Sequence, residues 1–328
     1  MNYLDLARLA APEIALVLGA LAVLGVDLSR RDNRSLNGRR AVALVLGVAG
    51  CVVSAAWLVA VAPEGALAGG MFVTDALGRW VKLVLLGLTA GTLLLSARAE
   101  FTEHPGEYVA LVLFGAVGML LVASVENVLM MFLALELTSV SLYLLAAFDK
   151  RDPQATEGAL KYFLFGGMAA AFLLFGLSFI YGATGAIEFR LIAQALAGKA
   201  ASPLLLAGLV MVLVGLGFKV AAVPFHFWAP DAYQGAPTPA AGFIAAGSKV
   251  AAFFVVAKLM AVAFAPVAGA GTWNGWVAGW APVVAWVAAA SMVLGNLAAL
   301  VQSNVKRLLA YSAVAHAGYT LVDRKSVV

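Results

Sequence analysis

Residues 203–264 read PLLLAGLVMVLVGLGFKVAAVPFHFWAPDAYQGAPTPAAGFIAAGSKVAAFFVVAKLMAVAF, and they carry the clearest structural signals in the chain. It opens with an apolar run that is long enough to cross a bilayer but carries Lys219 inside it. Pro224 and Pro230 then interrupt the run on either side of His226. Proline removes a backbone donor and clashes with the preceding turn, so we expect a helix that is broken here.

A polar turn follows, from Asp231 to Pro239, and a second apolar run then contains Lys249. A lysine at the centre of a membrane helix costs about 2.5–3.5 kcal/mol on insertion scales. Broken helices in membranes are tolerated where protein or a water-filled cavity covers the freed carbonyls. The clustering of these costly features predicts an ion pathway around a helix break near residues 222–231. The alternative is that Lys219 snorkels to an interface and that the prolines only end a helix.

The composition is that of a polytopic membrane protein. Of the 328 residues, 63% are hydrophobic and 12% are charged, and the mean hydropathy is +0.98. A soluble domain carries about twice that charged fraction. We therefore predict an all-α polytopic membrane protein with about ten transmembrane helices. The expected spans are 11–28, 41–62, 77–97, 108–125, 127–147, 159–182, 204–227, 238–264, 277–301 and 306–322.

The residues that commonly hold metals or redox centres are scarce. Cys51 is the single cysteine, which excludes cysteine-ligated zinc and iron–sulfur sites built within this chain. The three histidines, His104, His226 and His316, lack the spacing of a helical metal site. We therefore predict no metal, no bound cofactor and no nucleic-acid partner for the chain itself.

Basic residues predict the orientation in the membrane. The connector at residues 29–40, SRRDNRSLNGRR, holds five arginines and is expected to stay in the cytoplasm. Lys150, Arg151, Lys306 and Arg307 then fall on the same side. This topology places the N-terminus on the outer side of the inner membrane of a prokaryotic cell.

The outward connector at residues 183–202 has the pattern of an amphipathic helix lying on the membrane surface. An ordinary helical loop is an equal alternative. The residues expected on its apolar face are Ile187, Leu191, Ile192, Ala195 and Leu196.

Glu136 lies near the middle of the expected span 127–147. A carboxylate at that depth must be protonated, paired or facing water. Lys219 is at a similar depth and is the obvious partner. Burial favours the neutral forms of both groups and mutual attraction favours the charged forms, so a change in their separation changes proton affinity. A protonated core glutamate with one hydrogen bond is the alternative.

Other basic residues in the spans carry weaker signals. Lys161 sits near the start of its helix, where snorkelling is the default. Lys258 lies nine residues beyond Lys249, on the opposite helical face. Lys82 and Arg79 are close to the outer end of their span, and we expect both to snorkel.

His316 lies near the middle of the expected span 306–322. Ser312 precedes it by one turn and Tyr319 lies close on the same face. The usual pKa of histidine suits a proton relay. A neutral histidine with one hydrogen bond is the alternative.

Residues 221–253, AAVPFHFWAPDAYQGAPTPAAGFIAAGSKVAAF, resemble the antiporter-like membrane subunits of proton-pumping NADH:quinone oxidoreductase, respiratory complex I. The YQGAPTP turn followed by a lysine in the next helix is more similar to the N branch of that family than to the L and M branches. The resemblance implies that Glu136 and Lys219 form a pair, with Lys249 as the next relay. It also implies that His226 lies near the break and that His316 lies on the central polar axis. Lys161 would act as a modulating charge.

The resemblance implies an architecture of two inverted five-helix repeats with flanking helices. Residues 1–100 would then be a three-helix flank, residues 101–264 the complete first repeat with the discontinuous helix, and residues 265–322 the start of a truncated second repeat. NADH, FMN, iron–sulfur clusters and quinone would be bound by partner subunits of an oxidoreductase, so the chain would act as one subunit of an enzyme. The expected partners are the other membrane subunits, especially the sister antiporter-like ones, and the lipid bilayer.

The last six residues, 323–328, read DRKSVV, which is what a common sequencing adapter would encode in this frame. We expect this tail to be non-native and the natural chain to continue past Val322. A genuine short outer tail is the alternative.

Two rival functions remain open from the sequence. The first is a subunit of a multisubunit sodium/proton antiporter or of a membrane-bound hydrogenase. The YQGAPTP turn disfavours this first alternative. The second is a structural membrane subunit that conducts nothing and whose charges only lock helices together.

Overall fold

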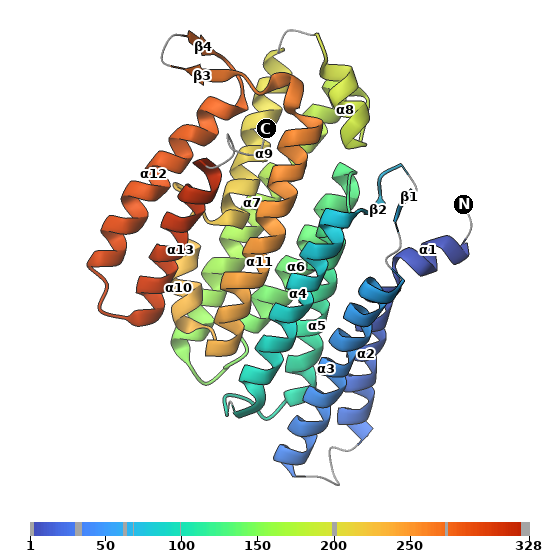
Figure 1. Cartoon of the computed structure of the whole chain (residues 1–328). Helices are drawn as coiled ribbons and strands as arrows, with labels where there is room; N and C mark the ends of the chain where they lie inside the picture. Colours follow the sequence, from blue (N-terminus) through green and yellow to red (C-terminus); the bar gives the residue numbers. More distant parts are fainter. Residues whose placement is uncertain are drawn as a thin grey trace. The chain divides into compact units, whose positions relative to one another are not determined.

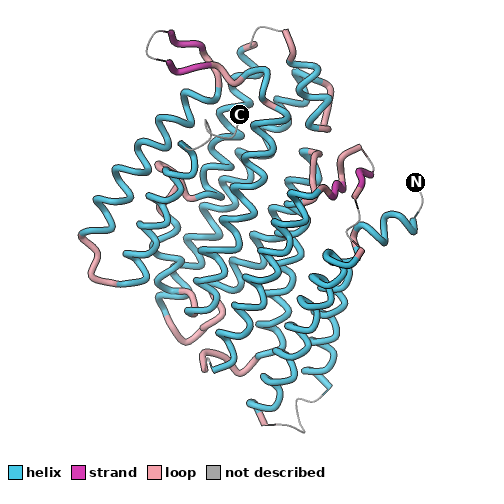
Figure 2. Tube along the Cα trace, in the orientation of Figure 1, coloured by secondary structure: helices cyan, strands magenta, loops and turns pink. Residues whose placement is uncertain are grey.

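The computed structural model describes residues 3–29, 35–61, 64–67, 69–98, 100–198, 202–272 and 275–322. The described chain is mostly helical, with two short hairpins (Figures 1 and 2). Arg30, Arg31 and Arg34 of the predicted cytoplasmic cluster lie outside the described residues, as does the tail 323–328.

The helices run in chain order as follows: α1 Tyr3–Leu9, α2 Ala11–Ser29, α3 Leu36–Ala60, α4 Ala76–Leu95, α5 Pro105–Ala123, α6 Val128–Ala146, α7 Pro153–Thr184, α8 Phe189–Leu196, α9 Pro203–Val220, α10 Trp228–Gly235, α11 Thr238–Lys258, α12 Trp280–Leu300 and α13 Val305–Val322. Short 3-10 turns cover Ser96–Arg98 and Ala265–Val267, and α11 continues as a π-helical turn over Leu259–Ala263. The antiparallel hairpins pair β1 Gly65–Leu67 with β2 Phe72–Thr74 and β3 Ala270–Thr272 with β4 Gly275–Val277.

Within the described residues, nine helices are long and apolar enough to cross a membrane: α2, α3, α4 with its 3-10 extension, α5, α6, α7, α9, α11 with its π turn, and α12. The predicted all-α polytopic fold is therefore confirmed. The tenth expected span corresponds to α13, which has sufficient length. Its polar residues, among them Lys306, Arg307 and His316, make it less apolar than the other nine.

The chain folds as two compact units, and the first comprises Met1–Ala159 and Gly235–Val255. Helix α5 is the most buried of the nine spans found in the described residues, and it packs against α2, α3, α4 and α6. Gly118 permits the close approach of α6, because a Cβ at this position would lie 2.4 Å from Thr138 Oγ1. The core of this unit is therefore built around α5.

The second unit comprises Leu160–Gln234 and Val256–Val328. Glycines bring α7 and α9 together: a Cβ at Gly215 would lie 2.5 Å from Leu173 Cβ, and one at Gly176 would lie 2.8 Å from the Gly208 carbonyl oxygen. The antiparallel pair α12 and α13 is packed just as closely, since a Cβ at Gly295 would lie 2.6 Å from the backbone nitrogen of Ala315. The predicted division into a flank, a first repeat and part of a second repeat stays a prediction.

A helix does form in the connector at 183–202, and it is α8. Phe189, Ile192 and Leu196 are buried, whereas Leu191 is 48% exposed. Helix α8 packs on the π turn at the end of α11 and on the 3-10 turn after it. Phe189 was not among the residues predicted for the apolar face, and the predicted place of this helix on the membrane surface stays a prediction.

The predicted discontinuous helix is present, with its break at residues 221–227, between α9 and α10. Ala221 adopts a left-handed conformation with φ 55° and ψ 42°, and the Val223–Pro224 peptide is cis. The prediction of a polar turn after the break was wrong, because residues 228–235 form α10. Pro230 falls in the first turn of this helix, where a missing N–H leaves no helical hydrogen bond unmade.

Candidate functional site

The helix break is held by side chains and backbone groups that replace the lost helical hydrogen bonds. The Ala222 N–H donates to the Gly217 carbonyl at 2.9 Å, and the Trp228 indole donates to the Phe218 carbonyl at 3.1 Å. The Val223 N–H donates to Ser291 Oγ of α12 at 2.9 Å. Non-helical backbone at membrane depth requires such partners, so this break is a built feature of the fold.

Aromatic rings fix the start of α10 against α7 and α9. The Trp228 ring stacks on the Tyr162 ring with centroids 4.2 Å apart and planes 5° apart. Phe218 also contacts Trp228, with ring centroids 5.1 Å apart. Since Trp228 is 1% exposed, this contact anchors the second half of the broken helix.

Two of the predicted relay residues lie at the break. Lys219 is half-buried in the last turn of α9, and its Nζ lies 5.9 Å from the centroid of the Phe218 ring. His226 lies in the connector just before α10 and is 8% exposed. Its ring contacts Phe227 and Tyr311, with centroids 4.5 and 6.2 Å away, and its Nδ1 has no hydrogen-bond partner among the described residues.

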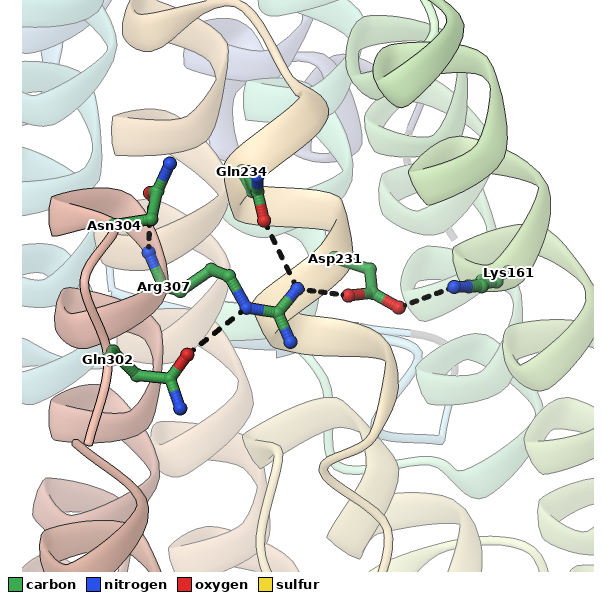
Figure 3. A network of polar contacts seen from close by, with 6 residues as sticks. All are labelled: Lys161, Asp231, Gln234, Gln302, Asn304 and Arg307. Carbon is green, nitrogen blue, oxygen red and sulfur yellow. Dashed lines mark hydrogen bonds and ion pairs between the residues drawn. The ribbon is translucent and has the colours of Figure 1, made fainter.

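An ion-pair network holds α10 through Asp231, which lies in the first turn of this helix (Figure 3). Asp231 Oδ2 lies 2.7 Å from Lys161 Nζ of α7, and Asp231 Oδ1 pairs with Arg307 Nη1 of α13. Arg307 also donates to Gln234 Oε1 at 3.1 Å and to Gln302 Oε1 at 3.3 Å. One carboxylate therefore joins three helices of the second unit.

Asp231 lies outside the nine spans, in α10. Burial by itself raises the pKa of this carboxyl group. Hydrogen bonds and positive charge from Lys161 and Arg307 outweigh burial, so the pKa is held below its usual value. The carboxylate is thus ionised at neutral pH and balances part of the charge of the two cations.

The predicted relay residues Glu136 and Lys249 lie in the first unit. Glu136 is half-buried on α6 and interacts electrostatically with Tyr143. Tyr143 also has a side-chain hydrogen bond with Ser139. Lys249 is 8% exposed on α11. Since Lys219 belongs to the second unit, its predicted pairing with Glu136 stays a prediction.

The predicted surroundings of His316 are confirmed. Its Nδ1 lies 2.7 Å from the Ser312 carbonyl oxygen and 3.4 Å from Ser312 Oγ. The Tyr319 ring meets the histidine edge-on, with centroids 5.5 Å apart, and the Tyr319 hydroxyl accepts a 2.7 Å hydrogen bond from Asn296 Nδ2. The His316 side chain is exposed on α13 in this chain.

The prediction for Lys82 was wrong. Instead of snorkelling, its ammonium forms a 2.7 Å ion pair with Glu13 of α2, and the two side chains are 1% and 5% exposed. Lys82 Nζ also lies 4.8 Å from the centroid of the Phe72 ring. Arg79, by contrast, reaches Glu64 at 4.0 Å and is partly exposed.

Three residues of these charged clusters were not predicted as site residues: Glu13, Asp231 and Arg307. Asp231 was assigned to a polar turn and Arg307 only to the topology, although both are charged groups next to the ends of apolar runs. Glu13 was overlooked, and a carboxylate inside the first expected span was the signal that could have found it.

A protein-family model described as "NADH:quinone oxidoreductase/Mrp antiporter, TM" matches residues 125–325. The chain belongs to this family. It is 47% identical to NADH-quinone oxidoreductase subunit N 2 of Acidobacterium capsulatum, an alignment that covers 98% of the chain and 66% of the relative. It is 39% identical to subunit N 1 of Rhizobium meliloti, covering 96% of the chain and 63% of that protein. The predicted resemblance to the N branch is therefore confirmed.

Solved structures show the same fold. A chain of respiratory complex I from Thermus thermophilus, solved with bound aureothin, superposes with a TM-score of 0.74 at 36% identity. That match covers 98% of this chain and 64% of the other. A membrane-bound sulfane sulfur reductase, an archaeal respiratory complex, has a TM-score of 0.78 at 25% identity. The chain spans less than two thirds of the length of the curated relatives it matches.

Proposed function

We propose that the chain is a proton-translocating membrane subunit of NADH:quinone oxidoreductase. Lys219 beside the stabilised helix break is the observation that carries this proposal. An ammonium in an apolar span is costly, and membrane proteins keep such groups on ion and proton pathways. We place the chain in the plasma membrane of a prokaryotic cell with the N-terminus outside, on the basis of the arginine-rich first connector.

Protons would pass along titratable side chains whose proton affinities depend on one another. Glu136 and Lys219 would act as the coupled pair, because a change in their separation changes both proton affinities. Lys249 on α11 would receive the proton next, and His226 would exchange it at the break. His316 would carry it toward the rest of the pathway, and Lys161 would modulate the charge of the pair.

Electron transfer would occur in partner subunits. NADH, FMN, iron–sulfur clusters and quinone are assigned to those partners, and the chain would contribute proton movement to the assembled enzyme. The relatives named as subunits of NADH-quinone oxidoreductase support an assembly of this kind. The expected neighbours are the other membrane subunits, especially the sister antiporter-like ones.

The sodium/proton antiporter and hydrogenase alternatives are disfavoured by the degree of similarity. The Mrp complex of Dietzia shares the fold, with a TM-score of 0.75, at 22% identity. Relatives named as subunit N of NADH-quinone oxidoreductase reach 47% identity. Proton transport that is independent of sodium in the assembled complex would support the preferred function.

The proposal is tested with Glu136→Gln in the complete complex, reconstituted in vesicles. NADH oxidation and proton uptake are measured in the same sample, and assembly is followed on native gels. We expect fewer protons moved per NADH oxidised in a normally assembled complex, while Glu100→Gln at an exposed loop position changes nothing. Unchanged pumping with weakened assembly would instead favour the structural-subunit alternative.

A further inference from the structure

The Lys161–Asp231–Arg307 triad has an unequal number of charges. Two cations share one carboxylate, each facing a different oxygen: Lys161 faces Oδ2 and Arg307 faces Oδ1. The triad therefore carries a net charge of about +1 when all three groups are ionised. Because the attraction of one carboxylate is divided between two cations, the hold on each depends on the other.

The three residues come from distant parts of the chain. Asp231 is 70 residues from Lys161 and 76 residues from Arg307. Figure 3 shows Asp231 on α10 reaching Lys161 on one side and Arg307 on the other. A displacement of α13 relative to α7 would therefore change the two pairs in opposite directions.

Arg307 is held by several of the groups that surround it. Its guanidinium donates to Asp231, Gln234 and Gln302, and its backbone N–H donates to Asn304 Oδ1 at 3.2 Å. A planar guanidinium with several fixed acceptors has one orientation, whereas a lysine ammonium sits on a flexible four-carbon stem. Arg307 is thus a firmly placed competitor for the carboxylate, and its pairing with Oδ1 reduces the attraction that is left for Lys161.

The backbone of α10 is tied to the same end of α13. Lys306 Nζ donates to the backbone carbonyl of Gln234 at 3.3 Å, and the side chain of this same residue accepts from Arg307. The C-terminal carbonyls of a helix carry partial negative charge and favour such a cation. The first turn of α13 therefore holds both the end of α10 and its carboxylate.

Partial exposure lets this site respond to charge. The Lys161, Asp231 and Arg307 side chains are 39%, 26% and 28% exposed. Water can reach the ammonium, and it can therefore exchange protons and react with reagents. The pair is nevertheless formed in surroundings less polar than bulk water, where a lost counter-charge is felt more strongly.

We propose that Asp231 is a positioning residue for Lys161, and that Arg307 competes for the same carboxylate so that the start of α13 sets how firmly Lys161 is held. This inference rests on the proposed function for its consequence, because Lys161 is assigned there as a modulating charge of the relay. The claim that Asp231 and Arg307 determine how firmly the Lys161 ammonium is held does not depend on the proposed function. The first of the two tests below is therefore independent of pumping.

The first test measures reductive methylation of Lys161 by mass spectrometry in the solubilised complex. The exposed Lys150 serves as an internal reference in each sample. Asp231→Asn should raise the rate of Lys161 methylation several-fold relative to Lys150, because it removes the negative charge that lies 2.7 Å from the ammonium. Arg307→Gln should lower that rate, because Lys161 then has the whole carboxylate. Equal methylation rates in the wild type and in both variants would overturn the proposal. If Asp231→Asn does not assemble, the methylation rate of Lys161 in Arg307→Gln decides whether the proposal holds.

The second test is a double-mutant cycle on protons moved per NADH oxidised. If Asp231 acts through Lys161, Asp231→Asn and Lys161→Gln each lower the ratio, and the double variant is no worse than Lys161→Gln. Asp231→Glu should restore most of the ratio. Effects that multiply in the double variant, or an Asp231→Asn complex that pumps normally, contradict the positioning role.

A control separates this role from the loss of any ion pair. Glu103 and Arg151 form a pair in which the side chains are 67% and 79% exposed. Glu103→Gln should leave both pumping and Lys161 methylation unchanged. Normal pumping in both Glu136→Gln and Lys219→Met would refute the proposed function. A changed methylation rate of Lys161 in Asp231→Asn and Arg307→Gln would still support the positioning of Lys161 by Asp231.

Discussion

The Val223 N–H donates a 2.9 Å hydrogen bond to Ser291 Oγ, although the two residues are 68 positions apart. Ser291 is fully buried, and its hydroxyl donates in turn to the Val287 carbonyl at 2.7 Å. The freed amide of the helix break is thereby satisfied by α12. This relay of hydrogen bonds explains how a non-helical segment persists inside a bundle of apolar helices.

Ser291→Ala should therefore weaken the break. The Val223 N–H is left buried without an acceptor, a loss of about 1–3 kcal/mol. Thermal unfolding of the purified protein in detergent measures the loss, and Ser291→Thr, which retains a hydroxyl, should recover part of it. A Ser291→Ala protein with unchanged stability would show that another group satisfies the amide.

The buried Glu13–Lys82 pair gives a second prediction. Glu13→Gln leaves the Lys82 ammonium buried without its counter-ion and should cost about 3–5 kcal/mol. The double substitution Glu13→Leu with Lys82→Met should cost far less, because it removes both charges and keeps the volume similar. Denaturant unfolding in mild detergent compares the two proteins. Equal losses in the single and double variants would contradict the pairing.

The lowered pKa of the Asp231 carboxyl group predicts that the stability of the protein depends on pH. Its folded-state pKa lies below the unfolded value. The stabilising contribution is therefore complete above the unfolded pKa and is lost as the pH falls through the folded pKa. The difference in melting temperature between wild type and Asp231→Asn should be largest near neutral pH and shrink in acid. A difference that does not change with pH would show that the carboxylate gains nothing from its cations.

The close approach of α7 and α9 is tested with two glycines of the second unit. Gly215→Val places its Cβ 2.5 Å from Leu173 Cβ and should destabilise the protein by about 1–3 kcal/mol. Gly167→Val is the matched control, because a Cβ there meets nothing within 4 Å. Melting temperatures in detergent should separate the two variants. A similar small effect for both would mean that the two helices can move apart at little cost.

Much of the fold was predictable because the signals are local. Apolar runs of sufficient length mark the spans, and Pro224 and Pro230 mark the break. The nine apolar spans and the broken helix follow from these features. Helix α10 was missed because it is only eight residues long and contains Pro230 and Gly235, residues typical of turns, and its stability comes from Trp228 packing on Tyr162.

The candidate site was only partly predictable. Lysines and acids within apolar runs stand out in the sequence, so Glu136, Lys219 and Lys249 were found. The ion pairs of the structure join residues from distant segments. No periodicity in the sequence links Glu13 to Lys82 or Asp231 to Arg307. Snorkelling is the general tendency of a lysine near a span end, and in Lys82 it was overridden by one carboxylate on a neighbouring helix.

In the function that we propose, Lys219 beside the helix break takes part in proton movement. The decisive measurement is the number of protons moved per NADH oxidised by the complete complex carrying Lys219→Met, with Lys150→Met as the exposed control. We predict normal assembly, fewer protons per NADH for Lys219→Met, and the wild-type ratio for Lys150→Met. A fully assembled Lys219→Met complex that pumps at the wild-type ratio would contradict the claim.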